Sequence, residues 1–365
     1  MDNKINTSVG TESVRDKYDI YRHCELCPRR CNVDRTKAVD FGHSKATGFD
    51  YTKAYGFDYT KSNVSDHTKA TGFDHNKANV SDHTKANGYC HVGAEPLAAR
   101  AALHMWEEPC ISGSEGSGTI FFCGCTLGCV YCQNFDISRT RATGKTITAE
   151  RLAEIFIDLQ SQGANNINLV TPTMFQPHII SAVGIARSLG LALPVLYNTS
   201  GYELPERISE LAGTVDVWLP DFKYLSHELA KRYSFAANYP EYARAALSKM
   251  VELCPTASYD ERGIMKRGVI VRHLLLPGQL AESMRVVEYL YSEYQNDICY
   301  SLMNQYTPTS GLDHAKYPEL SRRVTTYEYN KLVDYALSLG ITNAYIQEGG
   351  AVGESFIPTF DLRGI

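Results

Sequence analysis

The stretch TIFFCGCTLGCVYC, residues 119–132, carries the clearest signal of the fold. It opens with a short apolar run rich in β-branched and aromatic side chains, which predicts a buried strand at Thr119–Cys123. Three cysteines follow in a C-x3-C-x2-C spacing: Cys125, Cys129 and Cys132. Three thiolates in one loop are the right number to hold a four-iron, four-sulfur cluster and leave one iron open for another ligand. A structural zinc site would need a fourth cysteine or histidine nearby.

Further apolar runs follow this strand, and amphipathic stretches separate them. The other predicted strands are Asn166–Thr171, Pro194–Asn198, Val215–Leu219, Val269–Leu275 and Tyr300–Asn304. The predicted helices are Thr148–Gln162, Pro177–Leu189, Leu204–Ala212, Pro240–Leu253, Leu280–Tyr294 and Thr326–Leu339. Alternating strands and helices predict right-handed crossovers and a parallel sheet. We therefore predict an α/β fold, a partial (β/α)6 TIM-like barrel with its chemistry at the carboxyl ends of the strands.

A second group of cysteines lies nearer the amino terminus: Cys24, Cys27, Cys31 and Cys90. An eight-residue repeat, with lysine at every eighth position from Lys37 to Lys85, separates the last of them from the others. Subtracting residues 37–84 leaves a C-x2-C-x3-C-x10-C spacing, so we expect the four thiols to meet in space. Such a set holds either zinc or an iron–sulfur cluster. Arg29 and Arg30 are expected to offset its negative charge.

The remaining cysteines, Cys110, Cys123, Cys254 and Cys299, stand apart from these ligand spacings. Free cysteine behaves as a small apolar side chain, so core packing is predicted for all of them. The repeat offers too few apolar side chains to offset the entropy of ordering, which predicts disorder.

These patterns predict four parts of the chain. Residues 1–36 and 85–117 form a small Cys-rich metal-binding extension, residues 37–84 a repeat insertion, residues 118–350 the barrel and residues 351–365 a C-terminal tail.

Composition narrows the functional classes. No apolar run approaches the ~20 residues of a membrane span, so no membrane association is expected. The polar start resembles no secretory signal, which predicts a cytoplasmic protein. A net charge of −5 argues against nucleic acid as a partner.

The cysteine loop resembles the signature of the radical S-adenosylmethionine (radical SAM) enzymes, C-x3-C-x-aromatic-C. The resemblance implies that Cys125, Cys129 and Cys132 hold a [4Fe-4S] cluster that binds and reductively cleaves S-adenosylmethionine. The 5′-deoxyadenosyl radical formed would abstract hydrogen from a substrate. The resemblance also implies a contact between Tyr131 and the adenine ring.

Longer stretches are similar to the PflX-like branch related to pyruvate formate-lyase activating enzymes. They are HMWEEPCISGSEGSGTIFFCGCTLGCVYCQNFDIS (104–138), CELCPRRCNVDR, NINLVTPT, YNTSGY, LPDFKY, VIVRHLLLP and MNQY. Together they cover nearly the whole chain outside the repeat and the first ~20 residues.

Cofactor contacts are expected at the strand ends. The residues assigned to them are Thr171, Thr173, Asn198, Ser200, Asp221, Lys223, Arg272 and His273. Asp221 and Lys223 resemble the Asp-x-Lys of activating enzymes, whereas residues 171–173 lack the Gly-Gly-Glu that those enzymes usually carry. A charge inside an apolar strand is costly unless it faces a polar cavity, so we expect Arg272 or His273 to point into the barrel. A hydrogen-bonded core histidine is the alternative for His273.

Three functions fit these observations. The first is hydrogen abstraction from a polypeptide, such as a glycyl residue of a partner enzyme, with an electron donor such as flavodoxin or ferredoxin. The second is the same radical chemistry on a small molecule or another macromolecule. The third is a non-catalytic metal-binding or redox-sensing protein.

Overall fold

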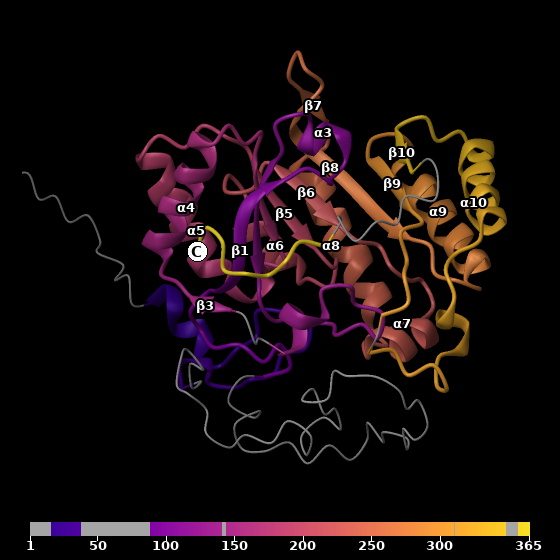
Figure 1. Ribbon diagram of the computed structural model, residues 1–365, viewed down its shortest axis with the longest axis horizontal. Helices are drawn as coiled ribbons and strands as arrows, with labels where there is room; N and C mark the ends of the chain where they lie inside the picture. Colours follow the sequence, from indigo (N-terminus) through magenta and orange to yellow (C-terminus); the bar gives the residue numbers. More distant parts are fainter. Residues whose placement is uncertain (1–15, 38–87, 141–143, 310, 348–356) are drawn as a thin grey trace, which may run out of the picture.

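The computed structural model describes residues 16–37, 88–140, 144–309, 311–347 and 357–365 (Figure 1). Apart from Lys37, the repeat insertion predicted at residues 37–84 lies outside these ranges. Seven of the described strands run parallel: β2 (Ser117–Phe122), β4 (Ile167–Val170), β5 (Val195–Thr199), β6 (Val217–Pro220), β8 (Met265–Leu274), β9 (Cys299–Met303) and β10 (Ala344–Ile346). The six predicted strands are all among them, and the short strand β10 was missed.

The sheet is an open, mostly parallel barrel. Antiparallel strands extend it beyond β2, where β1 (Leu97–His104) pairs with β2 and also with β3 (Lys145–Thr146). The strand order is β10-β9-β8-β6-β5-β4-β2-β1-β3, and β7 (Ser258–Tyr259) pairs with β8 outside this path. Within the described residues the two outer strands, β10 and β3, do not pair, which confirms the partial barrel.

Six helices confirm those predicted from sequence, to within about two residues at each end. They are α4 (Ala149–Ser161), α5 (Gln176–Ser188), α6 (Pro205–Glu210), α8 (Tyr239–Leu253), α9 (Leu280–Tyr294) and α10 (Thr326–Leu339). Thr148 caps α4 by accepting the Arg151 N–H. Two helices were not predicted, α3 (Pro109–Ser112) and α7 (His227–Ser234).

Short helical turns complete the chain. They are η1 (Asp16–Tyr21), η2 (Arg35–Lys37), the π-helical η3 (Asp136–Thr140), η4 (Thr173–Phe175) and η5 (Pro318–Ser321). No helix in the described ranges has both the length and the apolar character needed to span a bilayer.

Two elements, β1 and α3, lie before the predicted start of the barrel at residue 118. They fall within residues 85–117, which the sequence assigned to the Cys-rich extension. Cys110 and Ile111 of α3 pack against Leu196, Val217 and Ile270 inside the sheet. Side chains of residues 165 and 166 donate to carbonyls of α3, which places this helix at the amino ends of the parallel strands. The helix therefore closes that end of the barrel with an apolar core.

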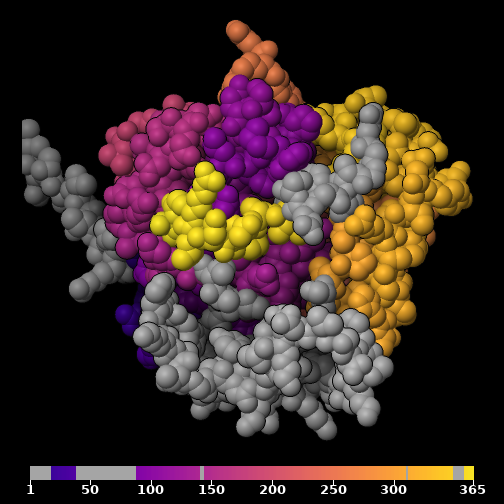
Figure 2. Space-filling model, in the orientation of Figure 1, coloured from indigo at the N-terminus to yellow at the C-terminus, as the bar shows by residue number. Residues whose placement is uncertain are grey.

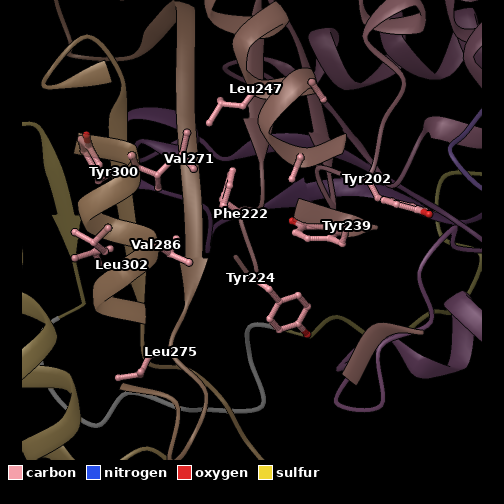
Figure 3. Close-up of a cluster of buried hydrophobic side chains, with 14 of the residues drawn as sticks. Tyr202, Phe222, Tyr224, Tyr239, Leu247, Val271, Leu275, Val286, Tyr300 and Leu302 are labelled. Carbon is pink, nitrogen blue, oxygen red and sulfur yellow. The ribbon is translucent and has the colours of Figure 1, made fainter. Parts of the chain in front are cut away.

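A large aromatic and aliphatic core lies between the sheet and its helices (Figure 3). Trp218 is fully buried there, and Tyr202, Tyr224 and Tyr239 are among its labelled members. The four isolated cysteines, Cys110, Cys123, Cys254 and Cys299, are between 0% and 3% exposed, which confirms that they pack in the core.

Tyr239 fixes the carboxyl ends of β5 and β6. Its hydroxyl lies 2.9 Å from the carbonyl oxygens of Ser200 and Asp221, and it accepts the N–H of Lys223 at 3.0 Å. The two loops are so close that a Cβ on Gly201 would lie 2.2 Å from the Asp221 carbonyl oxygen. This clamp sets the spacing of the strand ends that the sequence assigned to the cofactor.

Candidate functional site

The three-cysteine loop leaves the carboxyl end of β2, the first parallel strand. Cys125, Cys129 and Cys132 are partly buried in it. Each sulfur lies beside a hydrogen-bonding group: Leu127 N–H for Cys125 (3.4 Å), Ser234 Oγ for Cys129 (2.9 Å) and Ser138 Oγ for Cys132 (3.4 Å). Hydrogen bonds to sulfur favour the thiolate and orient metal ligands. The loop is therefore suited to three metal-bound thiolates.

A glycine and an arginine hold this loop against its surroundings. Gly128 has φ 76°, and a Cβ there would lie 1.1 Å from Nη2 of Arg139. Only glycine lets the guanidinium lie against the loop in this way. Arg139 also donates to the Tyr89 carbonyl at 3.3 Å and lies 4.9 Å from the Tyr89 ring centroid.

Two of the three thiols in the loop, those of Cys129 and Cys132, have raised pKa values and favour the protonated form when no metal is bound. Burial raises the pKa of the Cys132 thiol to about 11. Burial also raises the pKa of Cys129, although the nearby Lys223 opposes the shift. Metal coordination therefore has to displace these protons, which makes binding pH-dependent.

The structure brings the four amino-terminal cysteines together. Cys24, Cys27, Cys31 and Cys90 line one cavity, with Arg35 and Met174 in its wall. Each sulfur again has a donor: Arg35 Nη1 for Cys24 (3.5 Å), Tyr89 N–H for Cys31 (3.3 Å), and the backbone at Arg29 and Val92 for Cys27 and Cys90. Cys90 therefore lies close in space to the other three cysteines although it is distant in sequence, as subtraction of the repeat predicted.

Arg35 supplies the charge that this cavity needs. Its side chain is 1% exposed and donates to the carbonyls of Val92, Gly93 and Met174. None of the carboxylates in the described ranges pairs with it. A buried cation without a counter-ion costs several kcal/mol, so the sulfurs are its natural partners. An anionic thiolate site fits this arrangement better than four neutral thiols.

Arg29 does not offset that charge as expected. Its guanidinium reaches the other cysteine loop and donates to the carbonyls of Thr126, Leu127, Ser234 and Phe235. Arg29 also lies 3.8 Å from the ring centroid of Tyr89, whose hydroxyl bonds to the same Leu127 carbonyl. Arg29, which lies between Cys27 and Cys31 of the amino-terminal group, thus fixes the three-cysteine loop.

The other expected arginine, Arg30, points to the surface. It forms exposed ion pairs with Glu25 and Glu206. The positive charge beside the amino-terminal cysteines therefore comes from Arg35 and not from the two predicted arginines. The chain turns after Cys27, where Arg30 has φ 41°, and the side chains of Arg29 and Arg30 point in different directions.

In the part of the chain that the structure describes, no three cysteine, histidine, aspartate or glutamate side chains form a group that could hold a single metal ion.

Asp221 and Lys223 form a pair at the end of β6, 2.5 Å apart. Burial alone would lower the pKa of Lys223, but Asp221 and the Cys129 sulfur outweigh it and raise that pKa. Lys223 is therefore a fixed cation beside the three-cysteine loop. Asn198 and Ser200 lie on the adjoining strand end, where the Asn198 carbonyl accepts the Thr171 N–H at 2.9 Å.

Thr171 and Thr173 differ in their local structure: the first has an unusual backbone conformation, and the second donates a hydrogen bond to a buried carboxyl group. Thr171 has φ 58°, a left-handed conformation that β-branched residues rarely adopt. Thr173 donates its hydroxyl to the buried Glu203 at 2.6 Å, and Thr199 donates to the same oxygen. The second oxygen of Glu203 and the Tyr197 hydroxyl are buried without a partner in the described structure. Sequence reasoning missed Glu203 because nothing marks a lone glutamate after a turn as buried.

Tyr131 lies within the aromatic core. It is 6% exposed, its hydroxyl is 2.5 Å from that of Tyr224, and its ring makes edge contacts with Tyr233 and Tyr306. The predicted contact with adenine stays a prediction.

Arg272 and His273 point in opposite directions from β8. The Arg272 guanidinium pairs with Glu107 and Glu108 inside the barrel. His273 is 2% exposed, with Nδ1 2.7 Å from the Phe222 carbonyl and Nε2 2.8 Å from Ser283 Oγ. Burial lowers the pKa of His273, which makes it a neutral core residue at physiological pH.

The two glutamates were not predicted as site residues. They precede α3 and form a polar floor across the barrel, where Asn168 Nδ2 donates to Glu107 at 2.8 Å. Consecutive acidic residues between Trp106 and Pro109 were the available signal, because such charges in an apolar context need buried partners.

A family comparison bears on this geometry. The model of the radical SAM superfamily matches residues 119–289, a span that starts at β2 and includes the three-cysteine loop. Residues 119–289 of this chain are a radical SAM domain. Members of the superfamily are enzymes that use a [4Fe-4S] cluster and S-adenosylmethionine, and the resemblance of the cysteine loop is thereby confirmed at the level of the superfamily.

Individual proteins are also similar to this chain, at low sequence identity. The uncharacterized protein MJ0674 of Methanocaldococcus jannaschii is 31% identical over 244 residues, which cover 64% of this chain and 65% of the relative. Two solved structures are similar at 13% identity. HydG, a maturase of the [FeFe]-hydrogenase, has a TM-score of 0.42 with 60% of this chain and 48% of HydG covered. Methylornithine synthase (PylB) has a TM-score of 0.37 with 62% and 70% covered.

Replacing Arg29 tests the link between the two cysteine groups. Arg29→Ala removes the donors to four carbonyls around the three-cysteine loop, so the loop should lose its fixed shape. We expect affinity for iron in anaerobic reconstitution to fall about tenfold, with the far-UV circular dichroism unchanged. The adjacent Arg30→Ala, which loses only exposed ion pairs, is the matched control. Equal iron content in both variants would contradict the assigned role of Arg29.

Glu203 predicts how stability depends on pH. Burial raises the pKa of its carboxyl from 4.5 to about 7. Between these values the folded chain keeps a proton that the unfolded chain has lost, so the free energy of unfolding falls as pH rises through this range. Glu203→Gln should remove a fall of about 3 kcal/mol between pH 5 and 8, measured by urea unfolding.

The control for this measurement is Glu210→Gln, which changes a surface partner of Arg207. It should keep the slope of the parent chain. A Glu203→Gln variant with that same slope would show that the carboxyl ionises normally in the folded state.

Proposed function

We propose that this chain is a radical SAM enzyme of the activating-enzyme type, with Cys125, Cys129 and Cys132 as the ligands of its [4Fe-4S] cluster. The observation that supports this proposal is the loop itself, in which three sulfurs each have a hydrogen-bond partner at the carboxyl end of the first parallel strand. When bound, the cluster and S-adenosylmethionine supply the electron and the adenosyl group for hydrogen abstraction from a substrate.

The residues around the loop have separate tasks in this proposal. Arg29 and Arg139 hold the loop and place positive charge beside it. Lys223, fixed by Asp221, is suited to pair with the carboxylate of the methionyl group. Asn198 and Ser200 offer polar groups on the neighbouring strand end. The floor made by Glu107, Glu108 and Arg272 lies inside the barrel and gives a substrate polar groups to contact.

We propose a polypeptide as the substrate, with a glycyl residue of a partner enzyme as the specific case. The open sheet supports this, because its outer strands β10 and β3 leave a side through which a chain segment can approach. A small reducing protein such as flavodoxin or ferredoxin is the proposed electron donor.

We also propose a metal at the amino-terminal cysteines, either zinc or a second iron–sulfur cluster. Convergence of Cys24, Cys27, Cys31 and Cys90 beside the buried Arg35 supports it. The site tethers the amino-terminal segment to the barrel through Arg29, whichever metal it holds.

The test is anaerobic reconstitution with iron and sulfide, followed by reduction in the presence of S-adenosylmethionine. The parent chain should release 5′-deoxyadenosine, and Cys129→Ala should release none above background. Cys254→Ala is the control, because it removes a core cysteine outside both groups. Metal analysis of the Cys125/Cys129/Cys132→Ala variant should show metal retained at the other site.

Two results would count against this proposal. A reconstituted parent chain that never forms 5′-deoxyadenosine would favour a non-catalytic metal-binding or redox-sensing protein. If a small molecule stimulates turnover and no polypeptide does, the substrate belongs to another chemical class.

A further inference from the structure

Residues 357–365 lie along the open edge of the barrel, in the yellow segment that crosses β1 in Figures 1 and 2. The Ala101 N–H donates to the Arg363 carbonyl at 2.8 Å, and the Leu362 N–H donates to the Ala99 carbonyl at 3.0 Å. The strand β3 pairs with β1 only at Leu97 and Ala98. The segment therefore lies along the part of β1 that β3 leaves unpaired, and two main-chain hydrogen bonds hold it there.

Side chains of the segment are held by matching features of the barrel. Phe360 meets the Phe121 ring edge to face, with centroids 5.6 Å apart. Asp361 pairs with Arg100 at 2.6 Å, and the same guanidinium nitrogen donates to the Thr359 carbonyl at 3.0 Å. An apolar contact surface for the aromatic ring and a cation for the next residue thus lie side by side.

The glycine of this segment is also required by its surroundings. Gly364 has φ 77°, and a Cβ there would lie 2.2 Å from the Ala101 carbonyl oxygen. A side chain at this position would push the segment off the strand. The edge therefore selects for glycine three residues after the acidic position.

The apolar cluster under Phe360 reaches the base of the three-cysteine loop. Phe360 packs on a small cluster of buried side chains made by Ala99, Phe121, Cys123, Ile137 and Val170. Gly124, directly before Cys125, donates its N–H to the Ile137 carbonyl at 2.8 Å. A peptide bound along β1 thus passes beside the loop that leads to the proposed cluster.

We propose that the edge of β1 is a docking site for an extended polypeptide, and that residues 357–365 occupy it in cis. The site takes an aromatic residue followed by an acidic residue, with glycine three positions after the acid. Main-chain hydrogen bonds to a strand edge supply affinity, and the contacts of Phe360, Asp361 and Gly364 supply specificity. This deepens the proposed function, since a polypeptide substrate would enter by displacing the segment.

The test measures binding of a fluorescein-labelled peptide, IPTFDLRGI, to the full chain by fluorescence anisotropy. The parent chain should bind weakly because its own segment fills the site. A chain with Phe360→Ala and Asp361→Asn in that segment should bind the peptide about tenfold more tightly. Arg363→Ala is the matched control, because the Arg363 side chain is exposed and its carbonyl remains; it should bind like the parent.

Charge exchange checks the same site without relying on a weakened segment alone. Arg100→Asp in the double variant should lose binding of the original peptide and gain binding of a peptide with Asp361→Arg. Failure of the double variant to bind more tightly than the parent, or equal binding of peptides with and without Phe360, would overturn the proposal. Should the double variant unfold, a chain with Asp361→Arg alone takes its place in both measurements. The same outcomes then support or overturn the proposal.

These measurements separate this proposal from the proposed function, because peptide binding needs neither reduction nor S-adenosylmethionine. Peptide binding without formation of 5′-deoxyadenosine would support the docking site and contradict the proposed enzymatic activity. Deoxyadenosine formation without peptide binding would do the reverse.

Discussion

The bond network of Arg29 is the constraint on which the proposed site depends. A side chain that lies between two cysteines of one group supplies donors to four carbonyls around the other group. The amino-terminal segment is thereby more than an appendage of the barrel, because the shape of the three-cysteine loop depends on it. Tyr89 strengthens the link, since it stacks on Arg29 and bonds to the loop while following the repeat directly before Cys90. An insertion of any length between Cys31 and Cys90 is tolerable only if both ends still return to this point, and loop-closure entropy grows slowly enough to allow it.

The two ends of the barrel are built for different purposes. At the amino ends of the strands, α3 fills the interior with apolar side chains, and Glu107 and Glu108 above it engage Arg272. Buried ion pairs add little net stability compared with apolar packing, but loss of one partner leaves an unpaired buried charge, so replacing any one of these three residues is costly. At the carboxyl ends, Tyr239 and Lys223 fix the loops where the sequence assigned the cofactor. The open side between them carries the segment 357–365.

Periodicity predicted the parallel strands and their helices well, because buried strands and amphipathic helices leave direct patterns. It missed β1, whose sequence LAARAALH is rich in residues that favour helices; pairing with β2 overrides that preference. Cysteine spacing identified both cysteine groups and even the closeness of Cys90. The direction in which a side chain points was beyond the sequence, which is why Arg35, and not the expected Arg29 and Arg30, lies beside the amino-terminal cysteines. Glu203 was missed because burial of a single carboxyl depends on residues from three separate segments.

The most direct test of the central claim is the electron paramagnetic resonance spectrum of the reduced, reconstituted chain with and without S-adenosylmethionine. A cluster held by Cys125, Cys129 and Cys132 leaves one iron open, so added S-adenosylmethionine should change the spectrum. The same addition should have no effect on Cys129→Ala. A parent chain whose reduced spectrum is identical with and without S-adenosylmethionine would contradict the claim that this loop holds an open cluster.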